Sequence, residues 1–198
     1  MPLENLHPIF DQLLQRADKE RLLCQHAIVV WMTGLSGSGK STLANALERR
    51  LYQEGILTQI LDGDNIRTGI NNNLGFSEAD RTENIRRIAE IAKLFVQCGI
   101  VTICSFVSPT QAIRQLARNI IDTNDFVEIF IDAPLAVCEQ RDVKGLYQKA
   151  RAGQIRDFTG INAPFEPPTN PDCWIHTDQM NIEQALEKIY TFLIEKIK

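Results

Sequence analysis

The residues with the clearest chemistry form a glycine-rich stretch near the N-terminus. The stretch reads Gly34, Leu35, Ser36, Gly37, Ser38, Gly39, Lys40, Ser41 and Thr42. It contains the pattern G-x-x-x-x-G-K-[ST], in which glycines let successive backbone N–H groups turn toward an anion. In this pattern Lys40 reaches the β- and γ-phosphates of a nucleotide, and the Ser41 hydroxyl ligates Mg²⁺. The alternative is a glycine-rich turn that carries an incidental lysine.

The segments on either side of the stretch decide between these two interpretations. Residues 27–33 are an apolar, β-branched run that suits a buried strand. Residues 41–51 place leucines and an alanine on one face of a helix. Because that helix begins directly after the glycines, its partial positive charge adds to the anion site. Strand, glycine loop and helix in this order favour a nucleoside triphosphate site over an incidental turn.

The rest of the chain alternates apolar strands with helices. The further predicted strands are residues 56–61, 100–106, 126–132 and 173–176, and a last helix covers residues 181–197. Such alternation predicts an α/β fold in three layers, with a central parallel β-sheet, helices on both faces and right-handed crossovers. Ligands bind such sheets at the carboxyl ends of the strands. The segments expected to meet in one crevice there are residues 34–41, 62–65 and 105–109.

A single domain of residues 1–198 is predicted, with two less regular parts. In residues 1–26, Ile9, Phe10, Leu13, Leu14 and Ala17 recur at helical spacing. This predicts an N-terminal helical extension that packs on the domain or on a second subunit. Residues 142–171 hold lysines and arginines among glycines and prolines. This composition suggests a basic lid over phosphates, and a solvated surface loop is the alternative.

The overall composition excludes several classes of protein. A net charge of −4 argues against non-specific binding of nucleic acid or anionic membrane. Residues 1–10 lack the apolar segment of a signal peptide, and no apolar run approaches the ~18 residues that a membrane span needs. The five cysteines show no metal-ligand spacing, and three lie in apolar runs. Buried, reduced thiols in a cytoplasmic protein are predicted, with a regulatory disulfide as the alternative.

A phosphate loop alone does not name a reaction, because GTPases, ATP-driven motors and small-molecule kinases all use one. The guanine-reading motif N-K-x-D is absent from the sequence, and the basic lid favours a small kinase. Phosphoryl transfer needs a carboxylate near the acceptor hydroxyl. Asp62 and Asp64 follow the strand at residues 56–61 and point in opposite senses. One aspartate would act on the acceptor hydroxyl or on Mg²⁺, while the other braces the loop. The alternative interpretation of each aspartate is that it only caps the turn.

Several ordered motifs closely resemble the adenylylsulfate kinase family. They are DGDNIR at 62–67, LGFS at 74–77, DRTENIRR at 80–87, SFVSP at 105–109, CEQRD at 138–142, KGLYQKARAG at 144–153 and FTGI at 158–161. The resemblance runs from about residue 27 to residue 170. Many relatives have isoleucine where Val107 stands and tyrosine where Phe165 stands. Both substitutions keep the size and the apolar character of the side chain.

The resemblance implies a fold of the P-loop NTPase type and an ATP-dependent adenylylsulfate kinase. Such an enzyme transfers the γ-phosphoryl group of ATP to the 3′-hydroxyl of adenosine 5′-phosphosulfate in sulfate activation. The products are ADP and 3′-phosphoadenosine 5′-phosphosulfate. The family uses Mg²⁺ with ATP, is usually dimeric, and is cytoplasmic or plastidic. We therefore expect ATP and adenylylsulfate as partners, no nucleic acid or membrane partner, a homodimer and a cytoplasmic location.

The resemblance also implies roles for individual residues. ATP would be held by residues 34–42 together with Arg141. Phe76 and Phe158 would sandwich the adenine of the acceptor, because aromatic faces bind flat bases well. The residues expected around adenylylsulfate are Asp62, Asp64, Arg67, Phe76, Arg81, Asn84, Ser105, Phe106, Lys144 and Phe158. Arg67 and Arg81 would hold the phosphosulfate group, since planar guanidinium groups match its oxygens better than lysine does. Lys40 and Asp64 are the expected catalytic residues, and Ser41 and Asp64 the expected metal ligands.

Two interpretations of Ser108 remain open at this stage. Some family members are described as passing through a phosphoserine at this position, which would make Ser108 a third catalytic residue. The competing interpretation, which we favour from the sequence, is that Ser108 caps a helix beginning near Pro109.

Two further functional classes are carried as alternatives. One is a kinase with an adenylate-, gluconate- or shikimate-type acceptor. The other is a nucleotide-binding regulatory module without acceptor chemistry, which would explain the phosphate loop but not Asp64, Arg81 and Phe158.

Overall fold

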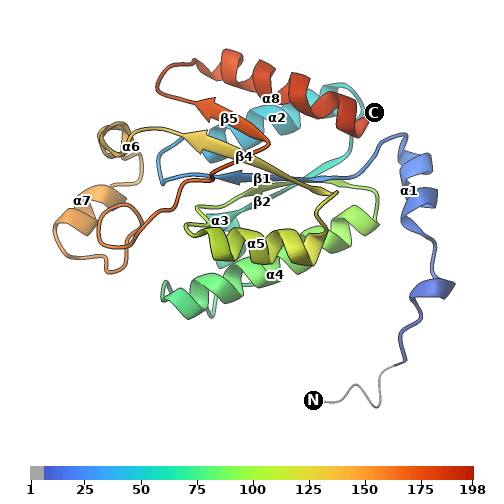
Figure 1. The fold of residues 1–198 in the computed structure, drawn as a ribbon, viewed down its shortest axis with the longest axis horizontal. Helices are drawn as coiled ribbons and strands as arrows, with labels where there is room; N and C mark the ends of the chain where they lie inside the picture. The colour runs from blue at the N-terminus through green and yellow to red at the C-terminus, as the bar shows by residue number, and fades with distance from the viewer. Residues whose placement is uncertain (1–6) are drawn as a thin grey trace.

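The computed structural model describes residues 7–198, which contain one parallel sheet between two layers of helices (Figure 1). The strands are β1 (Val29–Thr33), β2 (Thr58–Asp62), β3 (Val101–Ser105), β4 (Phe126–Asp132) and β5 (Cys173–His176). Their order across the sheet is β2-β3-β1-β4-β5, and every neighbouring pair is parallel. The predicted three-layer α/β fold is therefore confirmed.

Each face of the sheet carries its own apolar core. On one face, α2 (Lys40–Gln53) and α8 (Ile182–Ile197) pack against strand side chains such as Val30 and Ile129. On the other face, α4 (Glu78–Gln97) and α5 (Gln111–Ile121) cover Val29 and Trp31 (Figure 1). Alternate residues of β1 thus face opposite cores, as the two-residue period of a strand requires. No helix within residues 7–198 is long and apolar enough to cross a lipid bilayer.

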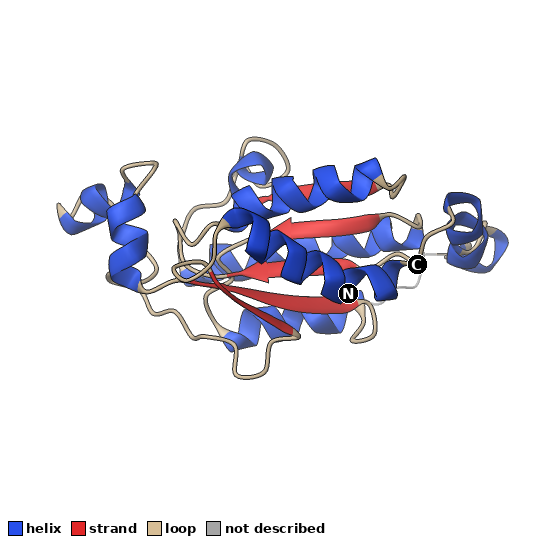
Figure 2. Cartoon of the chain, turned by 90° about the horizontal axis from the view of Figure 1, so that it is seen from above, coloured by secondary structure: helices blue, strands red, loops and turns tan. Residues whose placement is uncertain are grey.

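The register of the strands brings their carboxyl ends to one edge. Asp62 of β2 lies beside Ser105 of β3, and Met32 of β1 also pairs with Ser105. The short helices α3 (Gly63–Arg67), α6 (Leu135–Arg141) and α7 (Leu146–Arg151) belong to the segments that follow β2 and β4. Figures 1 and 2 show α6 and α7 projecting at the end toward which the strands point.

The N-terminal extension differs from its prediction and lies at the opposite end of the molecule (Figure 1). Its first six residues lie outside the described part of the chain. A short 3₁₀ helix covers Phe10–Gln12, and α1 covers Arg16–Leu23. The predicted helix over Ile9 to Ala17 was therefore wrong in position. The reason is local: Gln15 and Asp18 form a reciprocal capping box, which starts the helix at Arg16.

Candidate active site

The glycine loop after β1 can only be built from glycine at its first position. Gly34 has φ of 149°, and a Cβ placed there would lie 2.2 Å from the backbone oxygen of Ile131. A side chain would therefore collide with β4. Later in the loop, the Ser38 hydroxyl is buried and has no hydrogen-bond partner among the described residues. A buried polar group without a partner is unusual, and a bound phosphate oxygen would satisfy it.

Lys40 is the first residue of α2 and is buried under the same loop. Its Nζ donates to the backbone oxygens of Gly34 at 2.9 Å and Leu35 at 2.7 Å. Burial lowers the pKa of Lys40 to about 8, an effect that the neighbouring carboxylates of Asp62 and Asp64 oppose. The ammonium is thus held next to the loop, where incoming phosphate oxygens would replace the carbonyl partners.

Asp62, rather than Asp64, is the carboxylate that meets the predicted metal-binding serine. The Ser41 hydroxyl donates to Asp62 Oδ2 at 2.7 Å and lies 3.4 Å from the Ser105 hydroxyl. Asp62 also accepts from the backbone N–H of Asp64 at 3.1 Å and so caps α3. The side chain of Asp64 is 68% exposed and pairs instead with Lys144 of the lid. Asp62 therefore caps the turn and also bonds to Ser41, whereas the family resemblance pairs Ser41 with Asp64 as metal ligands.

The start of the predicted lid is attached to the glycine loop, and so is Arg141, which directly precedes it. Arg141, which is expected from the sequence to lie near ATP, donates to the backbone oxygens of Gly37 at 3.3 Å and Thr177 at 2.7 Å. The Tyr147 hydroxyl donates to the backbone oxygen of Ser36 at 2.8 Å. Sequence reasoning missed both Tyr147 and Thr177. Tyr147 stands inside a quoted motif, and Thr177 follows β5, so the rule that sites gather at strand ends could have found it.

The predicted acceptor residues gather around Phe76 at the start of α4. The guanidinium of Arg67 lies 4.4 Å from the centre of the Phe76 ring, and that of Arg81 lies 5.9 Å from it. Such distances allow cation–π attraction. The ring itself is 57% exposed. Arg81 Nε also donates to the backbone oxygen of Phe76 at 2.8 Å, so the arginine and the ring are held together.

Arg81 also joins α4 to the second part of the lid. Its Nη1 donates to the Thr159 hydroxyl at 2.9 Å, and its Nη2 donates to the backbone oxygen of Asp157. Phe158 lies between these two partners in the sequence and packs edge-on against Tyr147, with ring centres 5.0 Å apart. The two predicted adenine-binding rings, Phe76 and Phe158, are therefore linked through one arginine.

Asn84 and Phe106 support the site from behind. Asn84 is buried, and its Oδ1 accepts from Asn71 Nδ2 at 3.0 Å. This contact fixes the loop between α3 and α4. Phe106 is buried as well and stacks on Trp31, with ring centres 5.7 Å apart. A Cβ on Gly63 would lie 3.5 Å from the Phe106 ring, so the ring backs the turn that carries Asp62 and Asp64.

The helix-cap interpretation of Ser108 is wrong. Helix α5 begins at Gln111, and the side chain that caps it belongs to Thr110, which accepts from the backbone N–H of Ile113. Ser108 has φ of 37°, in the left-handed region, and is 3% exposed. The Trp31 indole N–H donates to its hydroxyl at 3.1 Å.

The Ser108 hydroxyl in turn donates to Thr33 Oγ1 at 2.9 Å. The hydroxyl is thus buried, donates its proton to one residue of β1 and accepts from another. These contacts give it a structural task and leave it poorly placed for attack on a phosphoryl group.

Comparisons with known proteins agree with a nucleotide-binding site built in this way. A family model described as "Adenylylsulphate kinase" matches residues 26–176. The chain is 56% identical over 194 residues to the "Adenylyl-sulfate kinase" of Bacteroides thetaiotaomicron, covering 98% of this chain and 96% of that protein.

Two solved structures are also similar. The Mycobacterium tuberculosis APS kinase CysC in complex with AMPPNP and APS matches with a TM-score of 0.82 and 47% identity, covering 85% of this chain and 98% of that one. A hexameric APS kinase from Thiobacillus denitrificans matches with a TM-score of 0.66 and 30% identity, covering 87% of this chain and 29% of that one.

The lowered pKa of Lys40 predicts that nucleotide affinity falls in alkaline solution. Below about pH 8 Lys40 is already charged, so binding of MgADP takes up no proton there. Above that pH the free protein carries neutral Lys40, and binding must take up a proton, at a cost of up to about tenfold in affinity per pH unit. Calorimetry in buffers of different ionisation enthalpy should show proton uptake at pH 9 and none at pH 7. Equal affinity and no uptake at both values would contradict the prediction.

The environment of Ser108 predicts that Ser108→Ala remains an active enzyme but is less stable. The change leaves the buried Trp31 N–H without its acceptor, which typically costs about 1–3 kcal/mol. It keeps the left-handed backbone, whereas Ser108→Gly loses the same hydroxyl and relieves that strain. Urea unfolding should therefore place the glycine variant between wild type and the alanine variant, with kcat largely kept in both. A folded Ser108→Ala protein without turnover would restore the phosphoserine interpretation.

Proposed function

The chain belongs to the adenylylsulfate kinase family, and we propose that the residues at the carboxyl edge of its sheet phosphorylate the 3′-hydroxyl of adenosine 5′-phosphosulfate with ATP. The observation that carries this proposal is the presence, after the carboxyl ends of neighbouring strands, of two separate cationic anchors besides the Ser41–Asp62 pair. One anchor is Lys40 under the glycine loop. The other is the cluster of Arg67 and Arg81 around Phe76.

The donor nucleotide lies on the first anchor. The backbone N–H groups of the glycine loop and the N-terminus of α2 receive the phosphates, and the buried Ser38 hydroxyl offers a further contact. Lys40 neutralises the charge that builds up on the transferring group. Arg141 sits against Gly37 and Thr177, beside the same phosphates.

The acceptor lies on the second anchor. The exposed face of Phe76 receives the adenine ring, and Phe158 of the lid covers it from the other side. Arg67 and Arg81 hold the phosphosulfate, because both guanidinium groups already face the Phe76 ring. The pKa of each arginine is lowered by burial, but both side chains remain charged in neutral solution.

The two aspartates divide the remaining work. The Ser41 hydroxyl and the Asp62 carboxylate form an oxygen pair of the kind that Mg²⁺ prefers, so these residues would hold the metal. When bound, Mg²⁺ neutralises charge on the β- and γ-phosphates. Asp64, exposed on the turn and paired with Lys144, faces the lid and accepts the proton of the 3′-hydroxyl. This assignment moves the metal from Asp64, as the sequence suggested, to Asp62.

Transfer then proceeds directly from donor to acceptor. With ATP on the first anchor and adenylylsulfate on the second, orientation supplies much of the rate enhancement. The buried hydroxyl of Ser108 takes no covalent part in this scheme. Residues 142–171 act as the lid, since three of them bond to residues that surround the substrates. These bonds join Lys144 to Asp64, Tyr147 to Ser36 and Thr159 to Arg81.

Assembly and location complete the proposal. A homodimer is supported by the exposed apolar side chains of the N-terminal extension, Ile9, Phe10, Leu13 and Leu14. A cytoplasmic location is supported by the buried thiols of Cys104, Cys138 and Cys173.

The proposed reaction is tested by ADP release in a coupled assay with MgATP. We expect turnover with adenylylsulfate and none with gluconate or shikimate. Arg81→Ala should raise the KM for adenylylsulfate by about tenfold to a hundredfold, because it removes charge-assisted hydrogen bonds, while the KM for ATP changes little.

The matched control is Arg86→Ala, on the same helix. Arg86 is bonded to Glu83 on the exposed surface, so its loss should leave both KM values unchanged. Turnover with a sugar acid, or an equal loss of affinity for both nucleotides in Arg81→Ala, would contradict the proposal.

The division of labour between the aspartates predicts two different phenotypes. Asp62→Asn should raise the Mg²⁺ concentration needed for half-maximal rate. Asp64→Asn should leave that concentration unchanged and lower kcat by about 10²–10⁴, as expected for a lost general base. Steady-state rates over a Mg²⁺ series measure both effects. A shifted Mg²⁺ requirement in Asp64→Asn alone would return the metal to Asp64.

A further inference from the structure

Arg114 of α5 joins three separate parts of the chain through three nitrogens of one guanidinium group. Its Nε lies 2.9 Å from Glu128 Oε1 on β4. Its Nη1 donates to the backbone oxygen of Ser108 at 2.9 Å, and its Nη2 donates to that of Glu166 at 2.8 Å. The residue is only 4% exposed. A buried cation is tolerated only with such partners, so α5 holds all three in fixed relative positions.

Glu166 belongs to the return segment, residues 164–172, which contains the last residues of the lid and leads to β5. Its backbone N–H donates to the oxygen of Pro109 at 2.7 Å. Its Oε2 accepts from the backbone N–H of Gln111 at 2.7 Å, at the N-terminus of α5 where a negative charge is favourable. Together with Arg114, these bonds attach the start of the return segment to the loop at residues 106–110.

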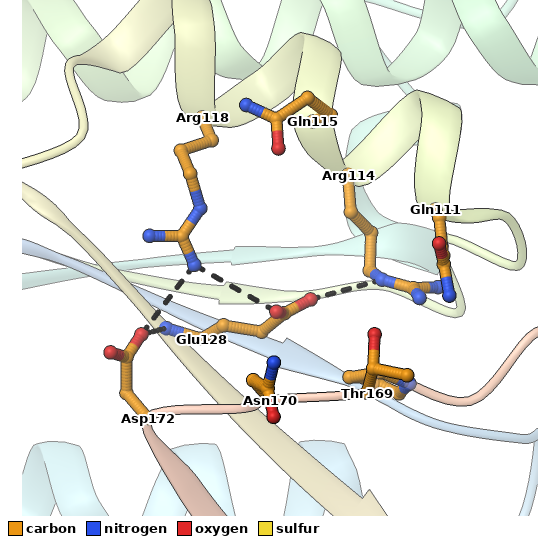
Figure 3. A pocket seen from close by; sticks show the side chains of 9 residues that line it. Gln111, Arg114, Gln115, Arg118, Glu128, Thr169, Asn170 and Asp172 are labelled. Atoms are coloured by element: carbon orange, nitrogen blue, oxygen red, sulfur yellow. Dashed lines mark hydrogen bonds and ion pairs between the residues drawn. The ribbon is translucent and has the colours of Figure 1, made fainter.

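The end of the return segment is attached independently. Asp172 Oδ2 accepts from the backbone N–H of Glu128 at 2.7 Å and lies 3.5 Å from Arg118. Figure 3 shows Arg114 and Arg118 extending from α5 toward the carboxylate of Glu128, with Arg118 also reaching Asp172. Two arginines here face two carboxylates, so the charges balance. The arrangement therefore suits a structural joint better than a site for an anion.

The parts that this joint connects both serve the acceptor side. The loop at residues 106–110 carries Phe106, which backs the turn of Asp62 and Asp64. The return segment follows directly on residues 157–163, whose Asp157 oxygen and Thr159 hydroxyl accept from Arg81. Near the other end of the lid, Tyr147 and the preceding Arg141 are bonded to the glycine loop instead. One end of the lid is thus attached to the residues proposed to bind adenylylsulfate, and the other end to the residues proposed to bind ATP.

We propose that Arg114 is a positioning residue for the acceptor: by locking the return segment to the loop at residues 106–110, it sets the place of the lid residues that cover adenylylsulfate. This inference rests on the proposed function for its kinetic consequence. Its structural consequence, an ordered lid at residues 157–166, does not depend on any activity.

Lysine cannot replace Arg114 in this role. A single ammonium on a flexible stem can stay near Glu128, but it cannot also reach the backbone oxygens of Ser108 and Glu166 in the planar geometry that a guanidinium provides. Arg114→Lys therefore keeps the buried charge and removes the connection.

The test compares Arg114→Lys with Arg118→Lys. Arg118 lies one turn later on α5 and shares Glu128, but its ion pairs with Glu128 and Asp172 reach neither Ser108 nor Glu166. In Arg114→Lys we expect the KM for adenylylsulfate to rise by about tenfold or more, with less than about a twofold change in the KM for ATP. Hydrogen exchange should become faster at residues 157–166. Arg118→Lys should show neither effect.

Each remaining outcome also decides the question. Unchanged exchange and KM in Arg114→Lys, equal changes for both substrates, or the same effects in Arg118→Lys would overturn the proposal. If Arg114→Lys does not fold, Glu166→Gln carries the test. It weakens the exposed bond to Gln111 and should raise the KM for adenylylsulfate several-fold, and no rise would overturn the proposal. A wild type without adenylylsulfate turnover would refute the proposed function, whereas the exchange measurement would still judge the joint.

Discussion

Parallel pairing of β1 with both β3 and β4 is the constraint on which the site depends. These ladders hold the three strands in register, so whatever follows each strand is delivered to one edge. β1 delivers the glycine loop, and β2, paired with β3, delivers Asp62 next to Ser105. The close approach is strict, because the Gly34 backbone runs against Ile131 of β4. A residue with a side chain at position 34 would prevent this approach, and Lys40 would then not lie beneath the loop.

The cations of the site are all bonded to oxygens of the chain itself. Lys40 is held by loop carbonyls, Lys144 by Asp64, and Arg81 by lid residues. These contacts reduce the cost of gathering positive charge in one place, and they are bonds that phosphate and sulfate oxygens can replace. The lid is therefore closed by the same groups that would bind the substrates. Substrate anions would compete with the lid for Arg81 and with the loop carbonyls for Lys40.

The sequence predicted the features that depend on local pattern and missed those that depend on contacts across the fold. Strand, loop and helix around Lys40 follow from hydrophobic period and glycine spacing, and Arg67, Phe76 and Arg81, which the family motifs assign to one substrate, lie close together in the structure. The resemblance assigned the metal to Asp64 together with Ser41, whereas Ser41 bonds to Asp62 in the structure, because the partner of Ser41 depends on which carboxylate the pleat of β2 turns toward it. The N-terminal helix was misplaced because a capping box outweighed apolar spacing. Arg114 gave no signal at all, since two of its three partners are backbone oxygens, which no sequence pattern marks.

The left-handed backbone of Ser108 connects the contacts of Ser108 with those of Arg114, which the sequence did not predict. A non-glycine residue in this conformation costs of order 1 kcal/mol or more and persists only where its surroundings over-determine it. At Ser108 the surroundings are the Trp31 indole and the Thr33 hydroxyl on the side chain, and Arg114 on the backbone oxygen. Arg114 also holds the lid's return segment through Glu166. Releasing the lid at this point would therefore remove one of the supports of a strained loop, so the two attachments stabilise each other. The fold thereby favours an acceptor side that is anchored before any substrate arrives.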